Sequence, residues 1–191
     1  MKKLLIALLL MGSQVMAQQA DYMPESREKL KTGIGIAFTG TDAMWGYSMN
    51  TAYHYYLNQN MSIAPGLSVM HFRDDQENVL RTAQAEAVDL GFYLHLMARQ
   101  PLSFEFGAGG NLRYFHWGIA TNLAESYTFD ETLIRAGSKR TFDHFTGGYF
   151  LSAGFSYRLN NNLRLLFSEV LQNDAKNNVT WDSRISLQIQ L

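Results

Sequence analysis

The chain has 191 residues, a formal net charge of −1 and no cysteine. A near-neutral chain lacks the basic surface that nucleic-acid binding requires, so we expect no nucleic-acid partner. The absence of cysteine excludes a disulfide scaffold and a thiolate zinc site.

The first residues have the three-part pattern of an export signal. Two lysines precede an apolar run at positions 4–11, and Val15 and Ala17 stand just before the expected cleavage site. The apolar run is about half the roughly 20 residues that a membrane-spanning helix needs. We therefore predict a cleaved signal peptide over residues 1–17 and a flexible leader over residues 18–31, where no hydrophobic period is present.

A two-residue hydrophobic period dominates the rest of the chain. It is clearest over residues 147–171, where two alternating limbs flank Asn160, Asn161 and Asn162. Asparagine tolerates the left-handed backbone of a tight turn, so this segment is predicted to be a β-hairpin with one apolar and one polar face. The same alternation predicts eight strands, in chain order over residues 32–38, 45–57, 61–69, 87–96, 102–114, 147–159, 163–171 and 179–191.

The connections between these strands alternate in length. Turns of about three or four residues follow the second, fourth and sixth strands, which places all three turns and both termini on one side of the sheet. The longer polar connections cover residues 73–85, 117–141 and 173–178. Because binding residues are often carried by loops on a rigid scaffold, one interpretation is that these three loops contact an extracellular ligand or surface partner. The alternative is that they only cover the mouth of the barrel.

Alternation alone does not decide whether the apolar face points inward, as in a soluble lipocalin-like barrel, or outward toward lipid. Three features favour lipid. The strands suffice for a tilted membrane crossing of roughly 9–11 residues, and Gly, Ser and Ala dominate the polar face, as expected beside a narrow lumen. Aromatic side chains of the apolar face also gather near strand ends, as in the girdles of membrane barrels. The expected girdle residues are Trp45, Tyr47, Tyr53, Tyr55, Tyr114, Tyr149, Tyr157 and Trp181.

With these features the chain resembles the small eight-stranded outer-membrane barrels of the OmpX type and the membrane domain of OmpA. The resemblance covers residues 32–191 and rests on strand number, connection lengths and girdles. Such proteins often end on an aromatic residue, whereas this chain ends on Leu191. The resemblance implies an all-β, eight-stranded antiparallel up-and-down transmembrane β-barrel, monomeric, in the outer membrane of a Gram-negative bacterium. Its implied partners are membrane lipid and the outer-membrane assembly machinery, and it implies no cofactor.

Seven charged side chains fall on the polar face and are expected to form a network in the lumen: Asp89, Glu105, Arg113, Arg158, Arg164, Asp182 and Arg184. Because an isolated buried charge is costly, we predict that the four arginines pair with the three acids. The favoured interpretation is a structural plug, since the lumen of eight strands is normally filled. The alternative is a narrow pore or a channel for small hydrophobic solutes.

Catalysis at the lipid boundary would require a serine, a histidine and an acid that meet there. Glu169 interrupts the apolar face of its strand, but no such set lies at a suitable spacing. A bulge near residues 165–167, or a position above the membrane, is predicted to explain Glu169. We therefore expect no catalytic, cofactor or metal site and a structural or surface-interaction role, with a lipid-modifying enzyme and a soluble periplasmic barrel as further alternatives.

Overall fold

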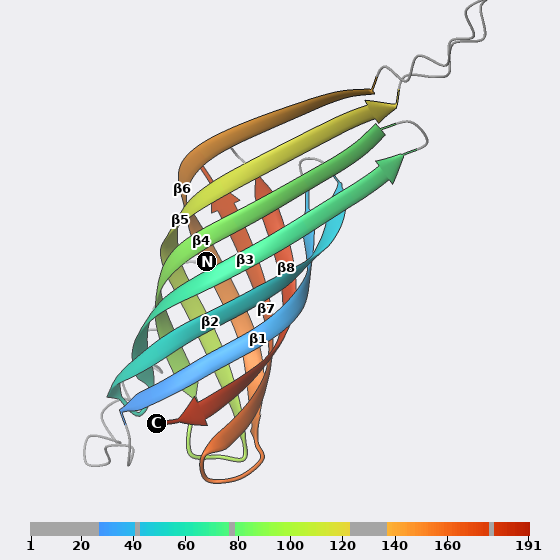
Figure 1. The fold of residues 1–191 in the computed structure, drawn as a ribbon. Coiled ribbons are helices and arrows are strands. Elements are labelled where there is room, and N and C mark those ends of the chain that lie inside the picture. The colour runs from blue at the N-terminus through green and yellow to red at the C-terminus, as the bar shows by residue number, and fades with distance from the viewer. Residues whose placement is uncertain (1–26, 41–42, 77–78, 123–136, 176–177) are drawn as a thin grey trace, which may run out of the picture.

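The computed structural model describes residues 27–40, 43–76, 79–122, 137–175 and 178–191 of the chain, and these residues form a closed barrel (Figure 1). Each strand pairs antiparallel with its neighbours in sequence, and β1 also pairs with β8. This confirms the predicted eight-stranded antiparallel up-and-down barrel. The strands are β1 (Glu28–Thr39), β2 (Met44–Asn58), β3 (Met61–Gln76), β4 (Val79–Leu96), β5 (Leu102–Asn122), β6 (Gly137–Arg158), β7 (Leu163–Asp174) and β8 (Val179–Gln190).

The exposure of the side chains alternates along every strand, and the apolar face is the exposed one. Ile34 and Leu90 are 63% and 60% exposed, whereas Arg113 and Asp182 are fully buried. A soluble barrel would bury its apolar face instead. The barrel is therefore built with its apolar side outward, and the predicted orientation is confirmed. Among the described residues, no helix is long and apolar enough to cross a membrane.

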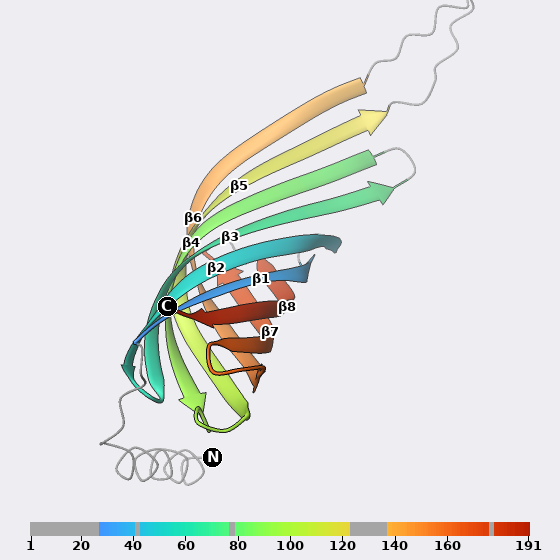
Figure 2. The same cartoon turned by 60° about the horizontal axis from the view of Figure 1, so that its bottom comes forward.

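The strands have unequal lengths, and this makes the two ends of the barrel different. β1, β7 and β8 have 12 residues each, whereas β5 and β6 have 21 and 22. The three tight turns lie at one end, where the amide of Leu191 also bonds the carbonyl of Glu28 at the start of β1. At the other end β3, β4, β5 and β6 project beyond the remaining strands (Figures 1 and 2).

One of the predicted loops is largely strand. β3 and β4 are interrupted only at residues 77–78, so the predicted loop 73–85 is wrong over most of its length. The polar stretch looked irregular because its outward residues are polar, yet its inward residues Phe72, Ala83 and Ala85 keep the two-residue period and are buried. Hydrogen bonds between strands do not require an apolar outer face.

The other connections and the leader also need correction. Of the predicted loop 117–141, residues 117–122 and 137–141 belong to β5 and β6, and residues 123–136 lie outside the described chain. β7 extends to Asp174, so the predicted loop 173–178 begins later. β1 starts at Glu28, which takes the last four residues of the predicted leader into the barrel. The proposed signal peptide over residues 1–17 also lies outside the described chain.

An apolar core fills the lumen toward the end where the long strands project. Met44, Met70, Phe72 and Phe115 are buried there together with small alanines, and Trp117 packs against them. The sequence predicted a lumen of small and polar side chains throughout, and this layer departs from that prediction. Large apolar side chains close the lumen at this level by ordinary packing.

Candidate functional site in the barrel lumen

A buried ion pair crosses the lumen near the tight-turn end. Nζ of Lys31 on β1 lies 2.6 Å from Oε1 of Glu105 on β5, and both side chains are 7% exposed. The second carboxylate oxygen of Glu105 lies 3.5 Å from Nδ1 of His95. The sequence prediction missed Lys31 because it assigned this residue to the leader. A longer β1 could have been predicted from the alternating pattern of the neighbouring β2, because the two strands pair along their length.

A chain of polar contacts continues from this pair to a second histidine. Oγ of Ser62 lies 2.8 Å from Nε2 of His95 and 3.1 Å from Nδ1 of His54. The ring of Tyr56 stacks on His95 with the centroids 4.9 Å apart, and Tyr93 lies 4.8 Å from His54. These side chains come from β2, β3 and β4, so the cluster links three neighbouring strands on the inside of the barrel. It was not predicted, because only folding of the sheet brings these strands to one level.

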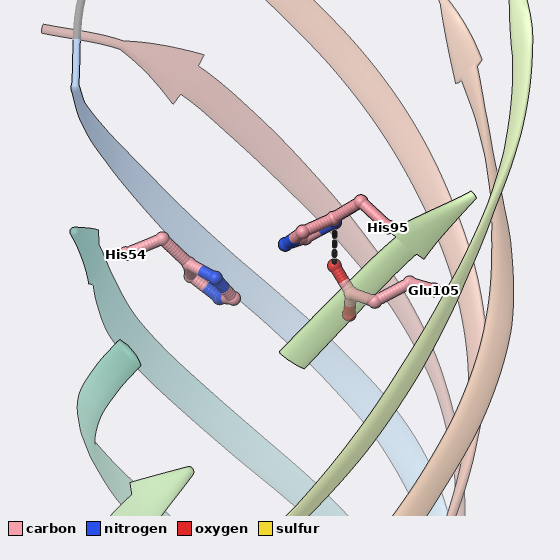
Figure 3. A group of neighbouring side chains, drawn as sticks. All are labelled: His54, His95 and Glu105. Carbon is pink, nitrogen blue, oxygen red and sulfur yellow. Dashed lines mark ion pairs between the residues drawn. The ribbon is translucent and has the colours of Figure 1, made fainter. Parts of the chain in front are cut away.

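His54, His95 and Glu105 also form a possible metal-binding group (Figure 3). One ligand atom from each lies within 4.8 Å of the other two, and two imidazoles with one carboxylate are a donor set that zinc accepts. However, the ammonium of Lys31 already neutralises Glu105. A dication placed here would stand beside that ammonium, so the charges of the site favour the internal ion pair over a metal.

A second charged group is formed by side chains of β8, β2, β3 and β4. Nε of Arg184 donates to Oδ2 of Asp182 at 2.5 Å, and Oγ of Ser48 donates to Oδ1 of Asp182 at 2.7 Å. Oγ of Ser68 donates to Asp89 at 3.0 Å. Asp182 and Arg184 therefore form the one predicted arginine–acid pair that the described residues contain.

Arg113 contradicts the prediction most clearly. Its side chain is fully buried, and none of its three guanidinium nitrogens has a hydrogen-bond partner among the described residues. The guanidinium carbon instead lies 5.3 Å from the centroid of the Phe115 ring. Of the three acids expected to pair with the arginines, Glu105 is paired with Lys31 and Asp182 with Arg184. Asp89 accepts a hydrogen bond from Ser68 and makes none with Arg113 within the described chain.

Arg158 and Arg164 are the remaining predicted network members, and they bind backbone rather than acids. Arg164 donates to the carbonyl of Ala98 at 2.5 Å and to Oγ of Ser103 at 2.8 Å, and Arg158 donates to the carbonyl of Arg99 at 2.8 Å. Both line a cavity of about 300 Å³ at the tight-turn end. Farther in, the lumen holds a cavity of only about 30 Å³, little more than one water molecule occupies.

The predicted girdle residues all lie on the outward phase of their strands. Trp45, Tyr149 and Trp181 are 64%, 56% and 52% exposed. Trp45 also packs on Phe38, with the ring centroids 4.8 Å apart. Their assignment to two lipid headgroup layers remains a prediction.

Glu169 lies on the same outward face, between the exposed residues Phe167 and Leu171. Its carboxylate accepts hydrogen bonds from Nε1 of Trp181 at 2.6 Å and from Oγ of Ser183 at 2.7 Å. The pairing of β7 with both neighbours is regular, so the predicted bulge is wrong. A serine and an acid do meet here, but no described histidine contacts them.

The outward face becomes polar on the projecting parts of the long strands. Nδ1 of His116 on β5 lies 2.5 Å from Oδ1 of Asp143 on β6, and both side chains are about half exposed. Gln84 donates to Glu86 at 2.9 Å on β4. The apolar band thus ends near Tyr114, whereas β5 continues to Asn122.

Comparison with known proteins agrees with this architecture. Residues 5–183 match the family model described as "Outer membrane protein beta-barrel domain". No curated protein matches the chain. Among solved structures, Neisserial surface protein A is similar with a TM-score of 0.65 and 12% identity, over 87% of this chain and 98% of that one.

Two further solved structures share the fold. The N-terminal β-barrel domain of Pseudomonas aeruginosa OprF has a TM-score of 0.52 and 13% identity, over 87% of this chain and 98% of that one. Ail, the attachment invasion locus protein of Yersinia pestis, has a TM-score of 0.50 and 12% identity, over 86% and 99%. At these identities the likeness concerns the fold alone. It confirms the resemblance to small outer-membrane barrels.

Proposed function

Since the chain belongs to the outer-membrane β-barrel family and is an outer-membrane protein, we propose that it acts as a surface-interaction protein. Its binding platform is the outer extension, by which we mean the projecting parts of β3 to β6 over residues 70–76, 79–87, 115–122 and 137–146. The main observation that supports this function is that the paired strands continue far beyond the apolar band. From Phe115 to Asn122, β5 adds roughly 26 Å of extended chain at about 3.3 Å per residue.

The outer extension has the composition of a contact surface. Phe142 and Phe145 are 52% and 66% exposed. Phe145 shares the outward face of β6 with the exposed Asp143, whereas Phe142 lies on the opposite face. Exposed aromatic residues with polar neighbours are typical of interaction surfaces. In membrane barrels the longer connections face the cell exterior, which supports an extracellular position for this end.

The filled lumen supports a binding role over a channel. An apolar layer, two charged groups and the His54–Ser62–His95 contacts occupy successive levels, and the described lumen holds no wide continuous space. We expect the purified protein to give no discrete openings in planar bilayers. Regular single-channel steps would favour the pore instead.

A lipid-modifying enzyme is the other alternative. Ser183 and Glu169 are in contact on the lipid face, but a base is needed to activate the serine and no described histidine reaches it. The mass spectrum of lipid A should therefore be unchanged in cells that overproduce the protein. A deacylated or newly acylated species would overturn this assignment.

The surface role is tested by adhesion. Ail, a structure of which is titled as a complex with the heparin analogue sucrose octasulfate, shares the fold and suggests heparin as one probe. Cells that display the wild-type protein should be retained on surfaces coated with heparin or serum proteins more than vector controls. The variant F142S/F145S should lose this retention, whereas I34A on the lipid face should keep it. Equal retention of wild-type and vector cells on every coating would refute the proposal.

We also propose that the protein is a monomer that outer-membrane assembly machinery inserts after cleavage of residues 1–17. The closed hydrogen-bonded sheet supports the monomer, because through the body of the barrel every strand pairs with a neighbour on both sides. The alternating apolar residues Leu187, Ile189 and Leu191 at the end of the chain offer the machinery an outward-facing strand. The size of the purified protein in detergent and the N-terminus of the mature chain check these two points.

A further inference from the structure

Two arginines stand directly opposite each other at the tight-turn end of the barrel. Arg158 on β6 and Arg164 on β7 are cross-strand partners, and both point into the lumen. The next residue across the sheet is Gln188 on β8, which in turn pairs with Lys31 on β1. Like charges that face each other directly across two strands repel and cost stability. Such an arrangement needs a compensating interaction.

The described chain supplies no acid for this purpose. Arg158 and Arg164 donate only to the backbone carbonyls at residues 98–100 and to the hydroxyls of Ser103 and Ser156. Lys29 nearby lies over the ring of Tyr56, 4.4 Å from its centroid, and has no acidic partner among the described residues. Glu105 is close, but Lys31 already neutralises it. Arg158, Arg164 and Lys29 therefore have no ion pair with an acid within the described part of the chain.

These cations line a cavity. Lys29, Arg158 and Arg164 line the cavity of about 300 Å³, which we call the basic vestibule, and the turn residues Ala98 and Asn161 stand at its rim. Its inner wall includes His95, Glu105 and Tyr56, beyond which the lumen is filled. The vestibule is thus a pocket rather than part of a passage, and its volume is at the lower end of the range for small-molecule sites.

We propose that the basic vestibule binds a phosphate-class oxyanion at the periplasmic end of the barrel. An anion between Arg158 and Arg164 relieves their repulsion, and guanidinium groups match the geometry of phosphate oxygens. The hydrogen bonds to the turn at residues 97–101 hold both side chains in place, so little side-chain entropy is lost on binding. The anion is either free phosphate or the headgroup of an inner-leaflet phospholipid. This inference is independent of the proposed surface role, which concerns the opposite end.

The test is calorimetric titration of the full chain, purified from outer membranes in an uncharged maltoside detergent. One arm uses inorganic phosphate at constant ionic strength, and the other uses short-chain phosphatidylglycerol in the same micelles. Saturable binding is expected in one arm or both, and the arm that titrates identifies the source of the anion. Binding by R158Q/R164Q should be at least about tenfold weaker, because each lost hydrogen bond to a charged group removes a factor of that order.

Three control variants separate binding from folding and from general charge. R73Q/R81Q removes two arginines from the opposite end and should bind as the wild type does. R158K/R164K keeps the charge but loses the planar fork, so its binding should fall between the two. K29Q removes a charge that makes no hydrogen bond within the described chain, and it should weaken binding without loss of the folded band on an unboiled gel. The absence of saturable binding in both arms, or equal binding by wild type and R158Q/R164Q, would overturn the proposal.

Discussion

The ammonium of Lys31 lies 2.6 Å from Oε1 of Glu105 and joins β1 to β5, two strands on opposite sides of the closed sheet. A contact of this kind connects halves of the barrel that share no backbone hydrogen bonds. Because both side chains are almost fully enclosed, the pair stays strong only while both charges are present.

Replacement of Lys31 alone should therefore be severe. We expect Lys31→Met to lower the free energy of unfolding by about 3–5 kcal/mol, since it leaves the buried carboxylate unpaired. The double variant K31M/E105Q should recover part of this loss. Urea titration of the protein in lipid vesicles, followed by tryptophan fluorescence, measures both.

The matched control is the pair of His116 and Asp143, which is about half exposed. Asp143→Asn should change stability by no more than about 1 kcal/mol, because water screens an exposed pair. If Lys31→Met were as mild as Asp143→Asn, the contact across the lumen would not be a structural element.

Arg113 leads to the opposite expectation. Its guanidinium is buried without hydrogen-bond partners among the described residues, so its desolvation is uncompensated there. Arg113→Met should be neutral or should raise the free energy of unfolding by about 1–2 kcal/mol. Arg184→Met, which breaks the pair with Asp182, should instead destabilise the barrel. A strong loss in Arg113→Met would indicate that water or an ion completes its hydrogen bonds.

Glu169 provides a test of polar contacts that face lipid. Glu169→Ala removes the acceptor for the indole of Trp181 and the hydroxyl of Ser183, and it should cost about 1–3 kcal/mol. Glu169→Gln keeps an acceptor oxygen and should be close to the wild type. Unfolding in vesicles measures both variants, and the emission of Trp181 should shift in the alanine variant alone. Identical behaviour of the two variants would argue against these hydrogen bonds.

The three tryptophans report which face meets lipid. Trp45 and Trp181 lie on the outward face, whereas Trp117 packs against the core of the lumen. In variants that retain a single tryptophan, brominated phospholipids should quench Trp45 and Trp181 strongly and Trp117 weakly. Strong quenching of Trp117 would mean that the orientation of the strands is reversed.

Zinc tests the group formed by His54, His95 and Glu105. Because Lys31 neutralises the carboxylate, we expect that added Zn²⁺ leaves the thermal unfolding temperature of the wild type unchanged. In K31M the same addition should be stabilising, since a dication then replaces the missing ammonium. A zinc-dependent rise in the wild type that disappears in H54A/H95A would show that the group binds metal despite Lys31.

The two-residue period could be read from the sequence because it follows directly from strand geometry. Side chains of a strand alternate between two faces, so the outward direction of residues such as Trp45, Tyr149 and Tyr157 follows from the sequence before any strand is paired. The number of strands, the tight turns and the outward girdle aromatics follow from the same local rule. For this reason the resemblance to the outer-membrane barrels could be recognised from the sequence.

The same rule does not predict which charged side chains pair across the lumen. Which acid meets which cation depends on the register and tilt of strands that are distant in sequence, and no local pattern encodes these. Lys31 and Glu105 meet for this reason, while Arg113 makes no hydrogen bond to an acid among the described residues. Closure of the sheet also brought Lys29 of β1 to the hairpin that carries Arg158 and Arg164, and so created the basic vestibule. The sequence by itself determined the faces of each strand, whereas the tertiary structure decided which charges are neighbours.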